Sequence, residues 1–326
     1  MIPLSVLDLV PVREGHTVSE ALADSAMLAQ AAEAAGYKRF WVAEHHGMDG
    51  IAGGATSVVL SHIGHATSTI RIGAGGIMLP NHNPFVIAEQ FGTLEALFPG
   101  RVDLGLGRAP GADGRIAQAL RKDLMRASES FPQDVVELRA RLSDDPGLAL
   151  KTTPGAGEAV EMWILGSSLF GAQLAAYLGL PYAFASHFAP AQLDAALEIY
   201  RANFQPSAIL DKPHVMAAMT VIAADSDAEA ALLSTSLDQS FVALRTGNPG
   251  KLKPPVEGFR ETLPPEAKAM LDGMRVASAI GGPATVRAGV ESFAERTKAD
   301  ELIFAGAIWD PEARRRSIEI AMAAVR

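Results

Sequence analysis

The chain has 326 residues, of which 48% are hydrophobic and 20% are charged, so it can bury a large core and is not a disordered sequence. Its formal net charge of −9 argues against a surface that binds nucleic acid or an anionic membrane. It has no cysteine, which excludes disulfides, thiolate catalysis and cysteine-bound metal.

The N-terminal residues show no targeting signal. They lack the basic region and the small-residue cleavage site of a signal peptide. No apolar run reaches the roughly 20 residues that span a bilayer. We therefore expect a soluble, cytoplasmic protein with no membrane partner.

Strands and helices alternate along the whole chain. The predicted strands cover residues 4–9, 39–43, 70–79, 102–106, 162–165, 182–185, 215–223 and 302–307. Helices are predicted at 17–35, 54–67, 85–98, 131–142 and from 169 to 178. Gly36 is expected to end the first of them and Pro84 to begin the third.

About eight strand–helix alternations predict a (β/α)8 barrel with insertions, formed as a single domain over residues 1–326. A doubly wound open sheet is the alternative, but that fold usually has a glycine-rich phosphate turn after its first strand. Leu9-Val10-Pro11-Val12 contains no such turn, so the barrel is preferred.

The stretch from 245 to 273 interrupts this alternation. It is mixed with glycine and charge, and it contains Pro249, Pro254, Pro255, Pro264 and Pro265. A loop of this length in a compact domain is usually either functional or disordered. We expect a proline-rich lid.

Two apolar segments end in charged or imidazole side chains, which strand packing does not require. Glu44-His45-His46 follows one strand, and Arg108 follows another. Parallel strands carry their chemistry at their carboxyl ends, which form the mouth of a barrel. The inward alternation through Trp41 and Ala43 directs His45 toward the mouth, where an imidazole can transfer protons.

An ordinary polar loop is the alternative for Glu44-His45-His46. Metal binding is disfavoured because the spacing does not put two ligands on one face and no carboxylate–histidine cluster joins them. We therefore predict no metal. Asn81 and His82 lie in a rigid polar turn at the same end, so Glu44, Asn81 and His82 are candidate mouth or substrate contacts.

Two further segments are candidates for ligand contacts. Gly166-Ser167-Ser168 opens a helix, whose free N–H groups can bind an anion together with Arg108, although the same residues also suit an ordinary N-cap. Gly75 and Gly76 lie in a glycine-rich strand. Bare backbone there suits a flat aromatic ring, and a tightly packed barrel interior is the alternative.

The helices at 54–67 and 85–98 have small or apolar residues on both faces, more than contact with one barrel requires. We expect them to form the interface of a homodimer. Glu89 interrupts the second helix and would be buried there, facing His46 of a second copy.

Taken in order, these segments resemble the bacterial luciferase-like flavin monooxygenase family. The resemblance rests on residues 43–46, 72–80, 88–90, 100–108, 166–168 and 179–181. It implies a (β/α)8 barrel that binds FMN at its mouth and takes reduced FMN from a separate NAD(P)H–flavin reductase. The flavin would react with O2 to form a C4a-peroxyflavin that oxygenates a small organic substrate.

By position, the resemblance implies that His45 is the catalytic histidine and that Gly75-Gly76 is a strained, often cis, peptide beneath the flavin ring. The resemblance also implies that the phosphate of FMN is bound by Arg108, Gly166, Ser167 and Ser168. Light-emitting members have a reactive cysteine where this chain has Gly107, so light emission is not expected. The alternatives are deazaflavin-dependent hydride transfer and flavin binding without turnover.

Overall fold

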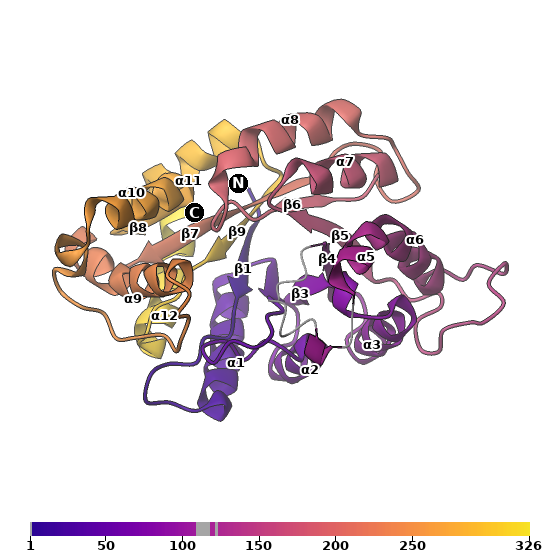
Figure 1. Cartoon of the computed structure of the whole chain (residues 1–326), viewed down its shortest axis with the longest axis horizontal. Helices are drawn as coiled ribbons and strands as arrows, with labels where there is room; N and C mark the ends of the chain where they lie inside the picture. Colours follow the sequence, from indigo (N-terminus) through magenta and orange to yellow (C-terminus); the bar gives the residue numbers. More distant parts are fainter. Residues whose placement is uncertain (1, 109–117, 121–122) are drawn as a thin grey trace.

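A closed ring of eight parallel strands forms the centre of the molecule in the computed structural model, which describes residues 2–108, 118–120 and 123–326. Neighbours in the ring follow chain order, and β9 closes it between β7 and β1. The predicted (β/α)8 barrel is thereby confirmed (Figure 1). The ring strands are β1 (Leu4–Asp8), β2 (Arg39–Val42), β3 (Arg71–Met78), β4 (Val102–Gly107), β5 (Glu161–Gly166), β6 (Tyr182–Phe184), β7 (Val215–Ala223) and β9 (Glu301–Ala305).

Helices surround the ring, with α1 to α3 on one side and α7 and α8 on the other (Figure 1). Thr17 and Glu20 form a reciprocal capping box at the start of the first helix, and Gly36 ends it with a φ of 86° that favours glycine. The helices packed along the barrel are α1 (Val18–Ala35), α2 (Thr56–Ala66), α3 (Pro84–Leu97), α6 (Phe131–Leu142), α7 (Leu169–Leu178), α8 (Leu193–Asn203), α11 (Pro283–Thr297) and α12 (Pro311–Val325).

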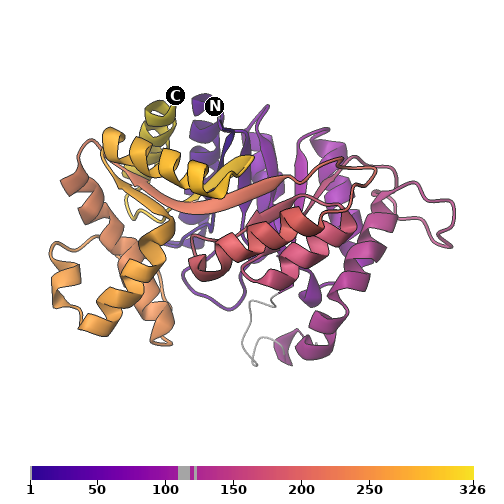
Figure 2. The same cartoon turned by 90° about the horizontal axis from the view of Figure 1, so that it is seen from above.

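The proline-rich segment differs from its prediction. After α9 (Asp227–Arg245) it contains the short helix η3 (Phe259–Thr262) and then α10 (Pro265–Met274). α9 and α10 lie together at one end of the molecule (Figure 2). The expectation of one long loop is wrong over the second part, because Pro265 occupies the first position of a helix, where its missing N–H costs nothing.

The sequence prediction also missed a short strand. β8 (Ser278–Gly281) pairs with the end of β7 and stands outside the closed ring. It has four residues, and its last residue is a glycine, so the alternation that indicates a strand is barely expressed.

Two large aromatic side chains fill the inside of the ring. Trp41 of β2 and Trp163 of β5 are fully buried and meet edge to face, with centroids 5.4 Å apart. The neighbouring strand makes room for them: a Cβ on Gly73 would lie 2.7 Å from the Trp41 indole nitrogen. The rest of the inner cluster consists of Leu7, Ala43, Ala183, Met216, Ala218, Ile303 and Ala305.

Below the tryptophans, at the amino ends of the strands, lies a buried charge network that we call the base. The Arg39 guanidinium lies 2.8 Å from Asp103, 3.0 Å from Glu161 and 3.0 Å from Glu301. Arg71 adds a second guanidinium at Asp103. The base therefore fills the amino end of the barrel with ion pairs. The carboxyl end of the barrel is then the candidate location of an active site.

Candidate active site at the mouth of the barrel

His45 follows β2, two positions after Ala43. Trp41 and Ala43 both belong to the inner cluster, as expected. The Nδ1 atom of His45 is buried and has no hydrogen-bond partner among the described residues. Burial lowers the pKa of His45, with Glu44 opposing this shift and His46 adding to it. The imidazole is thus held neutral with one nitrogen open to a partner.

His187 is a second buried histidine, and the sequence prediction missed it. It follows β6, and its Nδ1 atom is also buried without a partner within the described part of the chain. Burial and the neighbouring charge of His45 lower the pKa of His187 to about 4. Three strands separate β2 from β6 in either direction around the ring, so the two histidines reach the mouth from opposite sides.

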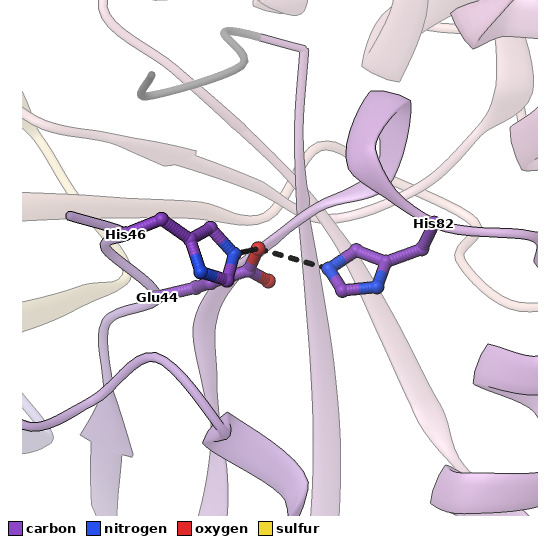
Figure 3. Close-up of side chains that lie close together, drawn as sticks. All are labelled: Glu44, His46 and His82. Atoms are coloured by element: carbon purple, nitrogen blue, oxygen red, sulfur yellow. Dashed lines mark hydrogen bonds and ion pairs between the residues drawn. The ribbon is translucent and has the colours of Figure 1, made fainter. Parts of the chain in front are cut away.

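A third group of side chains gathers around Glu44. Its buried carboxylate accepts hydrogen bonds at Oε1 from His46 Nε2 at 2.7 Å and from His82 Nε2 at 2.9 Å (Figure 3). Its Oε2 atom accepts the backbone N–H of Met78 at 3.1 Å. Burial alone would raise the pKa of Glu44, but the bonds from His82, Met78 and His46 lower it.

This cluster corrects two sequence expectations. A carboxylate–histidine cluster does exist, because His82, which follows the short helix η1 (Leu79–Asn81), reaches back to the end of β2. His46 also binds Glu44 within its own chain, so it does not need Glu89 of a second copy. Asn81, which precedes His82 at the end of η1, is buried.

The backbone of Gly75 and Gly76 is half-exposed between buried residues of β3, and the peptide bond between them is cis. Packing alone requires glycine at both positions. A Cβ on Gly75 would lie 2.7 Å from Leu7 Cδ1, and one on Gly76 would lie 2.6 Å from the Gly105 carbonyl oxygen. Close packing against neighbouring residues therefore explains why both positions are glycine. Because neither has a side chain, their backbone is accessible at the mouth.

Arg108 and the start of α7 come together at the ends of the neighbouring strands β4 and β5. The Arg108 guanidinium carbon lies 3.9 Å from the centre of the Phe170 ring, in the first turn of α7. Ser168 is the N-cap of this helix, but its side chain does not cap it, and Ser167 before it is exposed. The helix start therefore has backbone N–H groups available to an anion beside an exposed arginine.

No helix within residues 2–108, 118–120 and 123–326 is both long enough and apolar enough to cross a membrane. The fold and the mouth together define the chain as an α/β-barrel protein with a candidate enzyme site at the carboxyl ends of its strands. A sequence model of the family described as luciferase-like monooxygenase matches residues 2–301. The chain belongs to this family, and this membership supports an oxidoreductase.

Similar proteins cover the whole chain. A protein of Escherichia coli K12 named luciferase-like monooxygenase is 49% identical over 322 residues, 98% of this chain and 96% of that protein. The crystal structure of apo-MsnO8 is 32% identical, with a TM-score of 0.88 over 99% of this chain and 98% of that one. The oxygenating constituent of 3,6-diketocamphane monooxygenase of Pseudomonas putida, solved with FMN, is 18% identical, with a TM-score of 0.74 over 100% and 98%.

Proposed function

We propose that this protein is an FMN-dependent monooxygenase that uses reduced FMN and O2 to oxygenate a small organic substrate at the mouth of the barrel. The observation that carries the proposal is the meeting of Arg108 with the uncapped start of α7. The proposed anion site there lies at the same barrel end as His45, whose Nδ1 atom has no partner among the described residues. Together they match a cofactor with a phosphate at one end and a reactive ring at the other.

The residues around the start of α7 fit a phosphate. The guanidinium of Arg108 is permanently charged and has several N–H donors, and it stacks on the ring of Phe170. Ser167 and Ser168 add hydroxyl donors, and the first turn of α7 adds backbone N–H groups and the positive end of the helix dipole. Gly166, at the end of β5, leads the chain into this turn.

The half-exposed backbone of Gly75 and Gly76 offers a surface without side chains to a flat ring. The chemistry that reduced FMN supplies when bound is the reductive activation of O2. We assign to His45 the control of the proton at the reacting centre, through the Nδ1 atom that no described residue occupies. Burial at the mouth limits access of water to that proton.

The proposal includes a separate NAD(P)H–flavin reductase as the source of reduced FMN. Support comes from the diketocamphane enzyme, whose structure is of an oxygenating constituent in complex with FMN. We also propose a cytoplasmic homodimer. Val58 on α2 and Val86 and Leu97 on α3 are large apolar side chains that are 68%, 44% and 50% exposed, which a second copy could cover.

Stopped-flow mixing of the protein and reduced FMN with O2 tests this function. A monooxygenase should change the rate of flavin reoxidation relative to free FMN, and product should appear when a panel of small ketones, aldehydes and thioethers is added. The same experiment with reduced deazaflavin and no O2 tests hydride transfer. Turnover with deazaflavin alone would identify the alternative reaction, and tight flavin binding with no product under either condition would indicate a flavin-binding protein.

A further inference from the structure

Glu44, His46 and His82 converge more closely than a set of separate hydrogen bonds requires. One ligand atom from each of the three side chains lies within 4.8 Å of the other two. Figure 3 shows both imidazoles directed at the Glu44 carboxylate, one from the segment after β2 and the other from the turn after η1. Both histidines use Nε2 toward the same carboxylate oxygen.

The ion pairs of this cluster differ from those of the buried carboxylates at the base. Glu44 is 1% exposed, and the ion pairs described for it are made with histidines, not with lysine or arginine. At the base, by contrast, Asp103 and Glu301 each pair with a buried arginine. The buried carboxylate of Glu44 and the two imidazole nitrogens that converge on it are all atoms that can bind a cation.

We propose that Glu44, His46 and His82 form a binding site for a divalent transition-metal cation such as Zn2+. Imidazole nitrogen and carboxylate oxygen are the ligand types that Zn2+ and its neighbours prefer, and three protein ligands leave a further position for water. The side chains of His46 and His82 are 22% and 27% exposed, so an ion can reach them from the mouth. The Met78 N–H bond to Oε2 already orients the carboxylate.

Little movement is needed to admit the ion. Bonds of about 2.0–2.2 Å in a tetrahedral site place ligand atoms roughly 3.3 Å apart. The present separations of 2.7 and 2.9 Å must therefore open by about 0.5 Å as the shared N–H protons leave. His45 lies between two of the ligands in sequence, so a bound ion would fix the segment that carries it. Metal binding itself does not depend on the flavin reaction.

Isothermal titration of Zn2+ into the full-length, flavin-free protein, after treatment with a chelating resin, tests the site. We expect saturable binding of one ion in the micromolar range or tighter. His82→Gln keeps an N–H donor for Glu44 but removes the imidazole, and it should weaken binding at least about tenfold. His16→Ala is the matched control, because His16 also binds a carboxylate, that of Glu20 at 2.9 Å, but contacts Arg13 through its other ring nitrogen, and it should leave the affinity unchanged.

A second measurement keeps the test independent of how well the variants fold. Co2+ added to the unmodified protein should show the visible absorption of a low-coordinate nitrogen and oxygen site, and Zn2+ should abolish it. Equal Zn2+ affinity in His82→Gln and the unmodified protein would overturn the proposal, as would a Co2+ spectrum identical to that of the hydrated ion.

Discussion

At the amino ends of the strands, Arg39 meets three carboxylates at 2.8 to 3.0 Å, and its charge is permanent. At the carboxyl ends, the buried Glu44 is paired with histidines, and the Nδ1 atoms of His45 and His187 have no partner among the described residues. The base is built from arginines paired with carboxylates. The mouth is built from imidazoles around one carboxylate, the side chains that most often transfer protons in enzymes.

The difference follows from the cost of burying charge. An ion buried in a low-dielectric interior is tolerated when several opposite charges compensate it. Burial opposes the charge on Arg39, but Asp103, Glu301 and Glu161 raise its pKa. At the mouth burial lowers the pKa of His187 to about 4, and the interaction with His45 adds to this shift. The base therefore stabilises the fold, whereas the mouth is the candidate site for the reaction.

The largest effect should appear at the mouth. His45→Gln should slow product formation by roughly 10²–10⁴-fold, the usual contribution of a positioned acid or base, with little change in thermal unfolding. The exposed His65 on α2 provides the control, and His65→Gln should have the rate of the unmodified protein. A His45→Gln protein that forms product at the normal rate would show that the residue has a structural role.

At the base the effect should be on stability. Arg39→Met leaves three carboxylates without their shared partner and should lower the free energy of unfolding by about 3–5 kcal/mol, measured by urea denaturation. Lys38→Met is a matched control, because Lys38 binds the same Glu301 at 3.0 Å from a side chain that is 39% exposed. It should cost about 1 kcal/mol or less. Equal losses in the two variants would contradict the division between the two ends.

A smaller effect is expected at the phosphate site. Arg108→Ala should weaken binding of reduced FMN by about 1.5–3 kcal/mol, the range for a charge-assisted hydrogen bond, as measured by anaerobic titration. Arg296 on α11 also stacks on a phenylalanine, Phe293, with 5.3 Å between guanidinium carbon and ring centre. Arg296→Ala should bind reduced FMN normally, and an equal affinity in Arg108→Ala would remove Arg108 from the site.

Most of the barrel could be predicted from the sequence, because alternation and helical periodicity are local signals. The alternation that placed Trp41 and Ala43 inside the ring is a property of adjacent residues. β8 and α10 escaped because a four-residue strand has too little pattern and because a cluster of prolines indicates a loop as readily as a helix start.

The arrangement of the mouth could be predicted only in part. His45 follows from its own strand, but His82 reaches Glu44 across 38 positions of sequence, and His187 comes from the opposite side of the ring. Contacts between residues so far apart in sequence depend on how the strands are arranged in the barrel. Local sequence patterns do not determine that arrangement. The charge network of the base was missed for the same reason, since Arg39 and Glu301 are 262 positions apart.

The smallest effect concerns Glu33, a carboxylate that accepts hydrogen bonds from three consecutive backbone N–H groups. Burial alone would raise the pKa of Glu33, but the N–H groups of Thr69, Ile70 and Ser68 at the start of β3 lower it from 4.5 to about 2. A lowered carboxyl pKa stabilises the fold above pH 4.5, and this contribution is lost as the pH falls from about 4.5 to about 2.

Because Glu33 lies close to solvent, Glu33→Gln should cost only about 1 kcal/mol at pH 7, and the difference from the unmodified protein should shrink as urea denaturation is repeated toward pH 3. Glu295→Gln, at an exposed position of α11, should show no such pH-dependent difference. A Glu33→Gln deficit that stays constant from pH 7 to pH 3 would mean that the side chain contributes through packing and not through its charge.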